Sequence, residues 1–183
     1  MDPKAAALAI ESFLRAIGRN PDEDPELRGT GERVTEAFIQ DLCRGYDVDV
    51  AALLRENTLA APGSGPVILR DVPISTTCPH HLMLSTGTAT LAYEPKGKIV
   101  GVGALARLID AFANRLILQE SIGESVVGAL ESHVDPHWCA CRIVLTHGCM
   151  TARGQRRHGA SLETLAFRGD RASALAALGG GRG

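Results

Sequence analysis

Aromatic side chains are scarce in this sequence: phenylalanine, tryptophan and tyrosine together make up 4% of its 183 residues. The hydrophobic fraction is nevertheless 45%, so a single core of ordinary size must be built mainly from Ala, Val, Leu and Ile. An excess of one charge is also lacking, because 19 basic and 21 acidic residues leave a formal net charge of −2. We therefore expect no nucleic-acid partner that would be bound through bulk positive charge.

Long hydrophobic runs are absent as well. No stretch of about 18 or more apolar residues occurs, so the sequence predicts no membrane-spanning segment. Residues 1–20 form an amphipathic helical pattern without the basic lead and apolar run of a secretory signal, which favours a cytoplasmic protein. Five cysteines are an odd number, and in that compartment free thiols or metal ligands are expected.

The period of the hydrophobic pattern changes along the chain and predicts an α+β fold. Helical spacing occurs over residues 4–17, 31–42 and 104–132, the last with a predicted break near Arg115, and a short helix is expected within 47–60. Strand-like stretches occur at residues 67–74, 87–93, 98–102 and 139–150. A turn at Pro95–Gly97 predicts a hairpin between the second and third of these strands.

The composition also predicts how the chain is divided. We expect a helical N-terminal arm over residues 1–60 and a compact core over residues 61–171, which begins with a turn-rich Pro, Gly and Ser cluster. The Ala- and Gly-rich residues 172–183 are expected to form a disordered tail. No internal repeat is found.

The densest chemical cluster is Thr77–His81. Cys78 and His81 are three residues apart on a turn made by Pro79, so both side chains can reach one zinc ion. Taken alone, a Cys-x-x-His pair is weak evidence, since a turn with incidental polar residues gives the same pattern. A third ligand must come from elsewhere in the chain, and the candidates are Cys43, Cys139, Cys141, His147 and Cys149.

Strand geometry separates some of these candidates. In a continuous strand, Cys139 and Cys141 would lie roughly 26–33 Å from Cys149, at about 3.3 Å per residue, and could not share a metal ion with it. Both also share strand parity with apolar residues, which suits small buried core side chains. Cys149 stands at the strand's end, where sites are usually built, and is favoured. Three protein ligands leave one zinc position open, as in catalytic zinc sites.

Each of the other polar groups near these motifs has two possible roles, one functional and one structural. His80 and His147 can act as general acid or base beside a metal centre, or can be ordinary hydrogen-bonded histidines. Glu120, which follows Gln119 at a predicted helix start, can accept two parallel hydrogen bonds from a guanine edge, or simply complement the helix dipole. The basic loop Arg153–His158 suits phosphate recognition, and its alternative is a solvated turn.

These residues, in this order, resemble the GTP cyclohydrolase I family, from about Glu32 to Arg168. The stretches that carry the resemblance are Ser75–Leu82, Ala92–Gly101, Leu118–Glu120 and His147–Gly154. The resemblance implies the tunnelling fold, in which an antiparallel sheet is backed by two helices and preceded by a helical arm. It also implies a ring of subunits, typically a homodecamer of two pentamers, with active sites between subunits.

The resemblance implies a reaction and the residues that perform it. Zinc-dependent hydrolysis would open the guanine imidazole ring of GTP at C8, release formate and give 7,8-dihydroneopterin triphosphate for pterin and folate biosynthesis. Cys78, His81 and Cys149 match the zinc ligands, whereas His80 and His147 match the catalytic histidines. The residues that match substrate-binding positions are Gln119 and Glu120, for guanine, and Arg33, Arg107 and Arg153, for the triphosphate.

The sequence departs from the family pattern at the phosphate side. Gly103 and Ala104 stand where the family usually has serine and lysine, and Glu36 stands where it has a second lysine. Each lost charge-assisted contact is worth on the order of 1.5–3 kcal/mol. Three hypotheses follow: a GTP cyclohydrolase I, a divergent paralogue that hydrolyses a purine with few or no phosphates, and a catalytically weak binding or regulatory subunit of a ring assembly.

Overall fold

The computed structural model describes residues 1–63 and 65–179, which form two compact units that meet in the sequence at Arg44 and Gly45. The first unit is helical, as the sequence predicts. Its elements are α1 (Pro3–Ala16), the 3-10 turn η1 (Pro25–Leu27), α2 (Thr30–Ala37) and the π-helical turn η2 (Phe38–Leu42). Asp2 caps α1, because its carboxylate accepts a hydrogen bond from the Ala5 amide at 3.0 Å.

The second unit contains all the strands and begins before the expected boundary at residue 60. Its elements are η3 (Arg44–Asp47, which starts one residue earlier), α3 (Val50–Glu56), β1 (Thr58–Ala60), β2 (Val67–Thr77), β3 (Leu84–Glu94), β4 (Lys98–Val100), α4 (Val102–Ala113), α5 (Gln119–Val134), β5 (Trp138–His147), α6 (Gly148–Thr151), β6 (Leu162–Gly169) and α7 (Arg171–Gly179). The boundary shifts because Leu53 and Leu54 of α3 are buried in the core of this unit.

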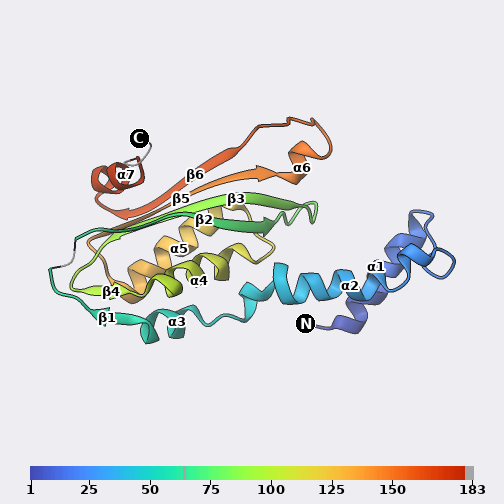
Figure 1. The fold of residues 1–183 in the computed structure, drawn as a ribbon, viewed down its shortest axis with the longest axis horizontal. Helices are drawn as coiled ribbons and strands as arrows, with labels where there is room; N and C mark the ends of the chain where they lie inside the picture. The colour runs from blue at the N-terminus through green and yellow to red at the C-terminus, as the bar shows by residue number, and fades with distance from the viewer. Residues whose placement is uncertain (64, 180–183) are drawn as a thin grey trace. The chain divides into compact units, whose positions relative to one another are not determined.

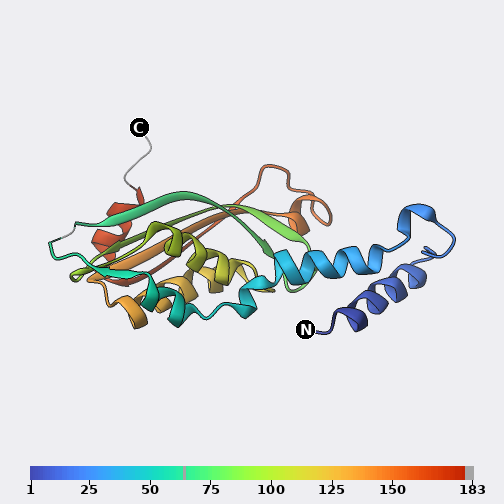
Figure 2. The same ribbon diagram turned by 60° about the horizontal axis from the view of Figure 1, so that its bottom comes forward.

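Four strands form one antiparallel sheet in the order β2-β3-β5-β6, and α4 and α5 lie along one of its faces (Figures 1 and 2). The break between the two helices, predicted near Arg115, lies at residues 114–118. The predicted hairpin of β3 with β4 is wrong. Both edges of β3 are already paired, with β2 and with β5, so β4 pairs with β1 in a separate two-stranded sheet.

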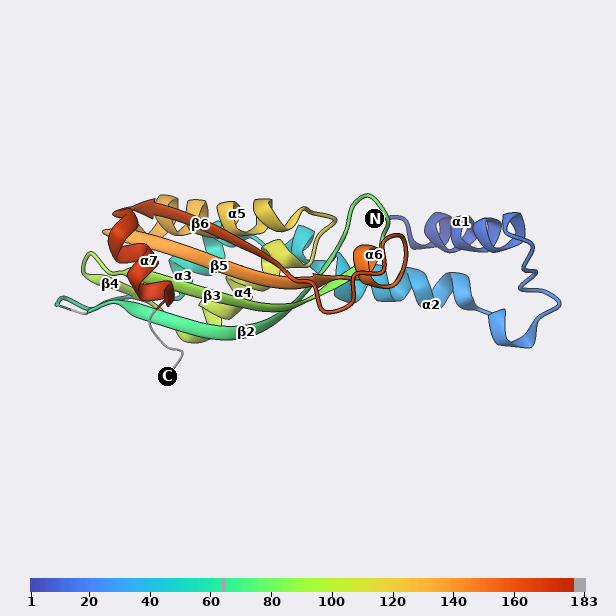
Figure 3. The ribbon, with the colours of Figure 1, turned by 90° about the horizontal axis from the view of Figure 1, so that it is seen from above.

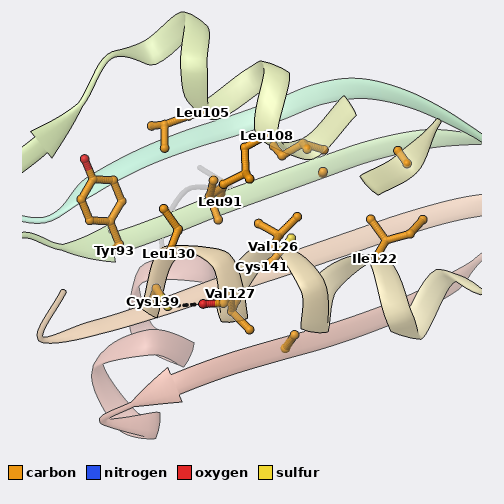
Figure 4. Close-up of a cluster of buried hydrophobic side chains, with 14 of the residues drawn as sticks. Leu91, Tyr93, Leu105, Leu108, Ile122, Val126, Val127, Leu130, Cys139 and Cys141 are labelled. Atoms are coloured by element: carbon orange, nitrogen blue, oxygen red, sulfur yellow. Dashed lines mark hydrogen bonds between the residues drawn. The ribbon is translucent and has the colours of Figure 1, made fainter. Parts of the chain in front are cut away.

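The core lies between the sheet and the two helices. Alternate strand residues point into it, among them Leu91 and Tyr93 of β3 and Cys139 and Cys141 of β5 (Figure 4). The helices contribute aliphatic side chains, namely Leu105, Leu108, Ile122, Val126, Val127 and Leu130. Burying one such side chain stabilises the fold by roughly 1.5–3 kcal/mol. A core poor in aromatics is thus filled mainly by branched aliphatic residues.

The last helix covers part of the opposite face of the sheet. α7 lies across the strands on the side away from α4 and α5 (Figures 1 and 3). Its Ala174 and Leu178 are buried against Ala92, Trp138 and Ala140, whose side chains alternate with the core residues. The structure therefore differs from the expected disordered tail at residues 172–179, because this face offers apolar side chains on which a helix can pack. Residues 180–183 lie outside the described part of the chain.

Candidate metal centre

The loop between β2 and β3 brings Cys78 and His81 together. The Cys78 amide donates to the Met83 carbonyl, and the Leu82 amide donates to the Cys78 carbonyl, each at 2.9 Å. These bonds, together with a left-handed Leu82 (φ 53°), close a tight loop directly after β2. As a result, the Cys78 sulfur lies 3.7 Å from Nδ1 of His81.

The end of β5 supplies a third donor. β5 stops at His147 and the chain turns at once into α6, which carries Cys149. The turn needs glycine at position 148, since a Cβ there would lie 2.5 Å from the carbonyl oxygen of Leu84 on β3. This close approach of the two backbones sets Cys149 against the β2–β3 loop.

Cys78, His81 and Cys149 form one group whose three donor atoms all lie within 4.8 Å of one another. Zinc binds cysteine sulfur at about 2.3 Å and histidine nitrogen at about 2.0–2.1 Å, so two donors around one tetrahedral ion lie about 3.6–3.8 Å apart. A small adjustment of these side chains suffices to hold one zinc ion. Two thiolates and one imidazole also leave a fourth position for water or substrate, the arrangement of catalytic zinc.

The surroundings of Cys149 indicate how a metal would bind. Burial raises the pKa of its thiol, the neighbouring Cys78 raises this pKa further, and the positive charge of Arg153 opposes both. The metal-free thiol is therefore protonated at neutral pH. Because zinc binds the thiolate, metal uptake must release a proton and tightens as the pH rises.

The other cysteines lie outside this group. Cys139 and Cys141 are fully buried in the core, and desolvation raises the pKa of each thiol to about 12. Cys139 donates instead to the Val127 carbonyl at 3.5 Å (Figure 4). Cys43 is buried in the first unit. Strand parity thus gives the right account of the two β5 cysteines.

Replacing Gly148 by alanine should weaken the metal centre. The new methyl group must displace the Leu84 backbone, and such overpacking costs typically 1–3 kcal/mol. We expect zinc affinity, measured by competition with a chromophoric chelator, to fall at least about tenfold, together with lower stability in urea. Gly103→Ala is the matched control, because nothing lies within 4 Å of a Cβ there. Unchanged zinc affinity in Gly148→Ala would contradict the close-approach argument.

The two catalytic histidines expected from the sequence occupy different environments. His80 is exposed, and its ring centroid lies 6.2 Å from that of His81. His147 is half-buried, and both of its ring nitrogens are engaged. Nδ1 lies 3.0 Å from the Ser85 hydroxyl, and Nε2 lies 2.8 Å from Oε1 of Gln119.

The two residues expected to bind guanine, Gln119 and Glu120, also differ in exposure. Gln119 is 2% exposed, whereas Glu120, the next residue of α5, is exposed. The Gln119 amide nitrogen faces the carbonyls of Ile143 and Leu162, each at 3.0 Å. Its side chain is therefore used inside the protein, and only Glu120 is free to meet a ligand.

The three expected phosphate arginines lie on three different elements of the chain. Arg153 is exposed in the loop after α6, close enough to Cys149 to influence its pKa. Arg107 lies in the first half of α4, which begins beside β4, whereas the metal donors lie at the opposite end of the sheet (Figure 1). Arg33 belongs to the first unit, where its guanidinium donates to the Arg28 carbonyl and the Thr30 hydroxyl.

Comparison with known proteins identifies the family of the chain. A family model described as GTP cyclohydrolase I matches residues 6–176. The chain belongs to the GTP cyclohydrolase I family. It is 39% identical over 164 residues to a GTP cyclohydrolase 1 of Bartonella henselae, which covers 88% of this chain and 78% of the relative. It is 34% identical over 165 residues to a GTP cyclohydrolase 1 of Chlorobaculum tepidum, with 88% and 71% covered.

The expected fold is confirmed by a solved structure. The apo form of the archaeosine synthase QueF-Like superimposes with a TM-score of 0.50 at 17% identity, over 59% of this chain and 97% of that one. At this identity the likeness concerns the fold alone. It supports the tunnelling fold, which GTP cyclohydrolase I family membership and the antiparallel sheet backed by α4 and α5 also indicate.

Where the chain departs from the GTP cyclohydrolase I pattern, the structure distinguishes the positions. Gly103 faces open space, with nothing within 4 Å of a Cβ, whereas Ala104 is 2% exposed and packs in the core. Glu36 is exposed in the first unit. No helix in the described ranges is long and apolar enough to cross a membrane.

One neighbour of the GTP cyclohydrolase I motifs is missed by sequence reasoning. Ser85 is 1% exposed at the start of β3, and strand pairing sets it directly opposite His147. Its hydroxyl contacts the histidine ring only because β3 and β5 pair in this register. No local pattern reveals that register, since β3 and β5 are separated by both long helices.

Proposed function

We propose that this protein is a zinc-dependent GTP cyclohydrolase that opens the guanine imidazole ring of GTP and releases C8 as formate. The observation that carries the proposal is the group Cys78, His81 and Cys149, in a chain of this family. Zinc held by these three residues would supply Lewis-acid activation of water for hydrolysis at C8. After C8 leaves as formate, the ribose rearranges and its carbons close a new ring, so the product is 7,8-dihydroneopterin triphosphate, a pterin precursor.

The chain's own residues supply binding and proton transfer. Glu120 is exposed at the first turn of α5, where its carboxylate can accept the N1–H and 2-amino hydrogens of guanine in parallel. His80 is exposed beside His81, and we assign it the protonation of the ring nitrogen that leaves C8. Arg153 lies near Cys149, and we propose that its guanidinium binds the triphosphate.

A ring assembly, proposed here as a homodecamer, completes the site. Arg107 lies midway along α4, which begins beside β4, whereas the metal donors follow β2 and β5 at the other end of the sheet, so we propose that Arg107 meets a substrate held at a neighbouring subunit's metal group. Packing of subunits side by side would set one subunit's Arg107 near a neighbour's metal group. Active sites between subunits are thus consistent with the separation seen within one chain.

The second candidate is a paralogue that hydrolyses a purine with few or no phosphates. Gly103 leaves open space where the family has serine, and Glu36 brings a carboxylate in place of lysine. Ala104 adds little to this hypothesis, because its methyl group packs in the core and is not directed to solvent. Arg153 favours the triphosphate substrate, and we prefer GTP.

A substrate comparison tests these alternatives. Zinc-loaded protein is given GTP, guanosine and guanine in separate reactions, and formate release is measured. Because each charge-assisted phosphate contact contributes on the order of 1.5–3 kcal/mol, we expect kcat/KM for GTP to exceed that for guanosine at least about tenfold. Arg153→Gln should narrow this ratio.

The other outcomes are equally informative. Formate release from guanosine or guanine alone would overturn the GTP proposal in favour of the paralogue. No turnover of any of the three substrates by protein that holds zinc would support a binding or regulatory subunit.

A further inference from the structure

We propose that Gln119 is a positioning residue, which holds His147 as the tautomer protonated on Nε2 and leaves Nδ1 facing Ser85. Resemblance alone would give Gln119 a contact with guanine. The proposal rests on the proposed function for its kinetic part, whereas the tautomer can be measured without any turnover.

The orientation of the Gln119 amide is fixed by the backbone. Its nitrogen lies 3.0 Å from the carbonyl oxygens of both Ile143 on β5 and Leu162 on β6. Carbonyl oxygens only accept hydrogen bonds, so the amide nitrogen, which only donates, must face them. The Thr164 hydroxyl lies 3.2 Å from the same nitrogen and is compatible with this orientation.

This orientation determines the proton on His147. With the nitrogen of Gln119 turned toward the two strands, Oε1 must face the imidazole, and it lies 2.8 Å from Nε2. An amide oxygen only accepts, so Nε2 must carry a hydrogen. In a neutral imidazole Nδ1 then holds the lone pair, and the Ser85 hydroxyl, 3.0 Å away, donates to it.

Burial makes this chain of contacts rigid. Gln119 is 2% exposed and Ser85 is 1% exposed, so water does not compete for either side chain. A flip of the amide would turn its oxygen toward two carbonyls and its nitrogen toward Nε2, which leaves buried polar groups unpaired at about 1–3 kcal/mol each. The same contacts tie the first residue of α5 to β5 and β6, so the fold itself sets the histidine ring beside the metal loop.

The tautomer is tested by nitrogen-15 NMR of histidine-labelled, zinc-loaded protein, which reports directly which ring nitrogen carries hydrogen. The His147 signals are identified by their loss in His147→Asn. We expect wild type to show hydrogen on Nε2, and Ser85→Ala to keep it there, because Gln119 remains. Hydrogen on Nδ1, or a mixture, in either protein would overturn the proposal.

Kinetics separate positioning from guanine recognition. In Gln119→Met, Nε2 of His147 loses its acceptor, so the hydrogen is no longer held on that nitrogen. We expect kcat for GTP to fall at least about tenfold, as when general acid–base catalysis is impaired, and KM to stay within about twofold of wild type. Thr164→Val is the matched control, which keeps both carbonyl contacts and should preserve the tautomer and kcat. A raised KM with unchanged kcat in Gln119→Met would overturn the proposal, as would an equal loss of kcat in the control.

Loss of activity and a different His147 tautomer are separate outcomes. Wild-type protein that does not release formate from GTP would refute the proposed function, while the NMR signals of His147 would still decide its tautomer. If Gln119→Met does not fold, the spectra of wild type and Ser85→Ala decide by themselves.

Discussion

Cys149→Ala is expected to lose both zinc and activity. The substitution removes one of three donors, and its methyl group offers the metal no replacement. We expect metal analysis to fall from about one zinc per chain to background. Without metal activation, water attacks C8 far more slowly, and a loss of about 4 kcal/mol of transition-state stabilisation corresponds to about 1,000-fold in formate release.

Cys141→Ala is the matched control for this loss. It also removes one thiol, that of Cys141 on β5. This thiol lies in the core, where burial raises its pKa to about 12. We expect full zinc content and a lower free energy of unfolding, because a small cavity is left behind. Stoichiometric zinc in Cys149→Ala would refute the assignment of the third ligand.

His80→Ala is expected to keep zinc but lose most of its turnover. His80 and His81 are adjacent, yet only His81 belongs to the donor group. General acid–base catalysis by a positioned histidine contributes about 10²–10⁴-fold, so formate release from GTP should fall by that factor. Zinc content, measured on the same sample, should remain at the wild-type value.

His81→Ala makes the comparison decisive. It removes an imidazole of the same loop, but this one lies 3.7 Å from the Cys78 sulfur, so zinc should be lost together with turnover. If His80→Ala lost zinc as His81→Ala does, the neighbouring histidines could not be given separate roles. If His80→Ala kept full activity, its place as proton donor would be wrong.

The sequence predicts those features that depend on local pattern. Helical periodicity indicates the two core helices and the break between them, and strand parity indicates that Cys139 and Cys141 are core residues. The same reasoning misplaces β4, since a turn at Pro95–Gly97 suggests a hairpin although β3 has both edges occupied. It also overlooks α7, because an Ala-rich segment has little helical pattern of its own and is stabilised by the face on which it packs.

Long-range contacts explain what the sequence does not reveal about the site. Gln119 looks like a ligand contact beside Glu120, yet its amide is taken up by carbonyls of β5 and β6. Nothing near position 119 in the sequence indicates those partners, and β6 itself is absent from the predicted strands. Adjacent residues of one helix thus receive different roles only when the packing of α5 on the sheet is known.

The separation of the metal donors along the chain has a consequence for assembly of the native state. Cys78 and Cys149 lie on either side of α4 and α5 in the sequence and meet only because β3 and β5 pair in their native register. A slip of one residue would turn every β5 side chain to the other face. If the group holds zinc as proposed, the ion would bind tightly only after the sheet has formed, and by mass action it would then stabilise the folded chain by about 4 kcal/mol at a free concentration 1,000 times the Kd. A chain with a misregistered sheet would gain none of this stabilisation and would therefore unfold more readily than the native chain.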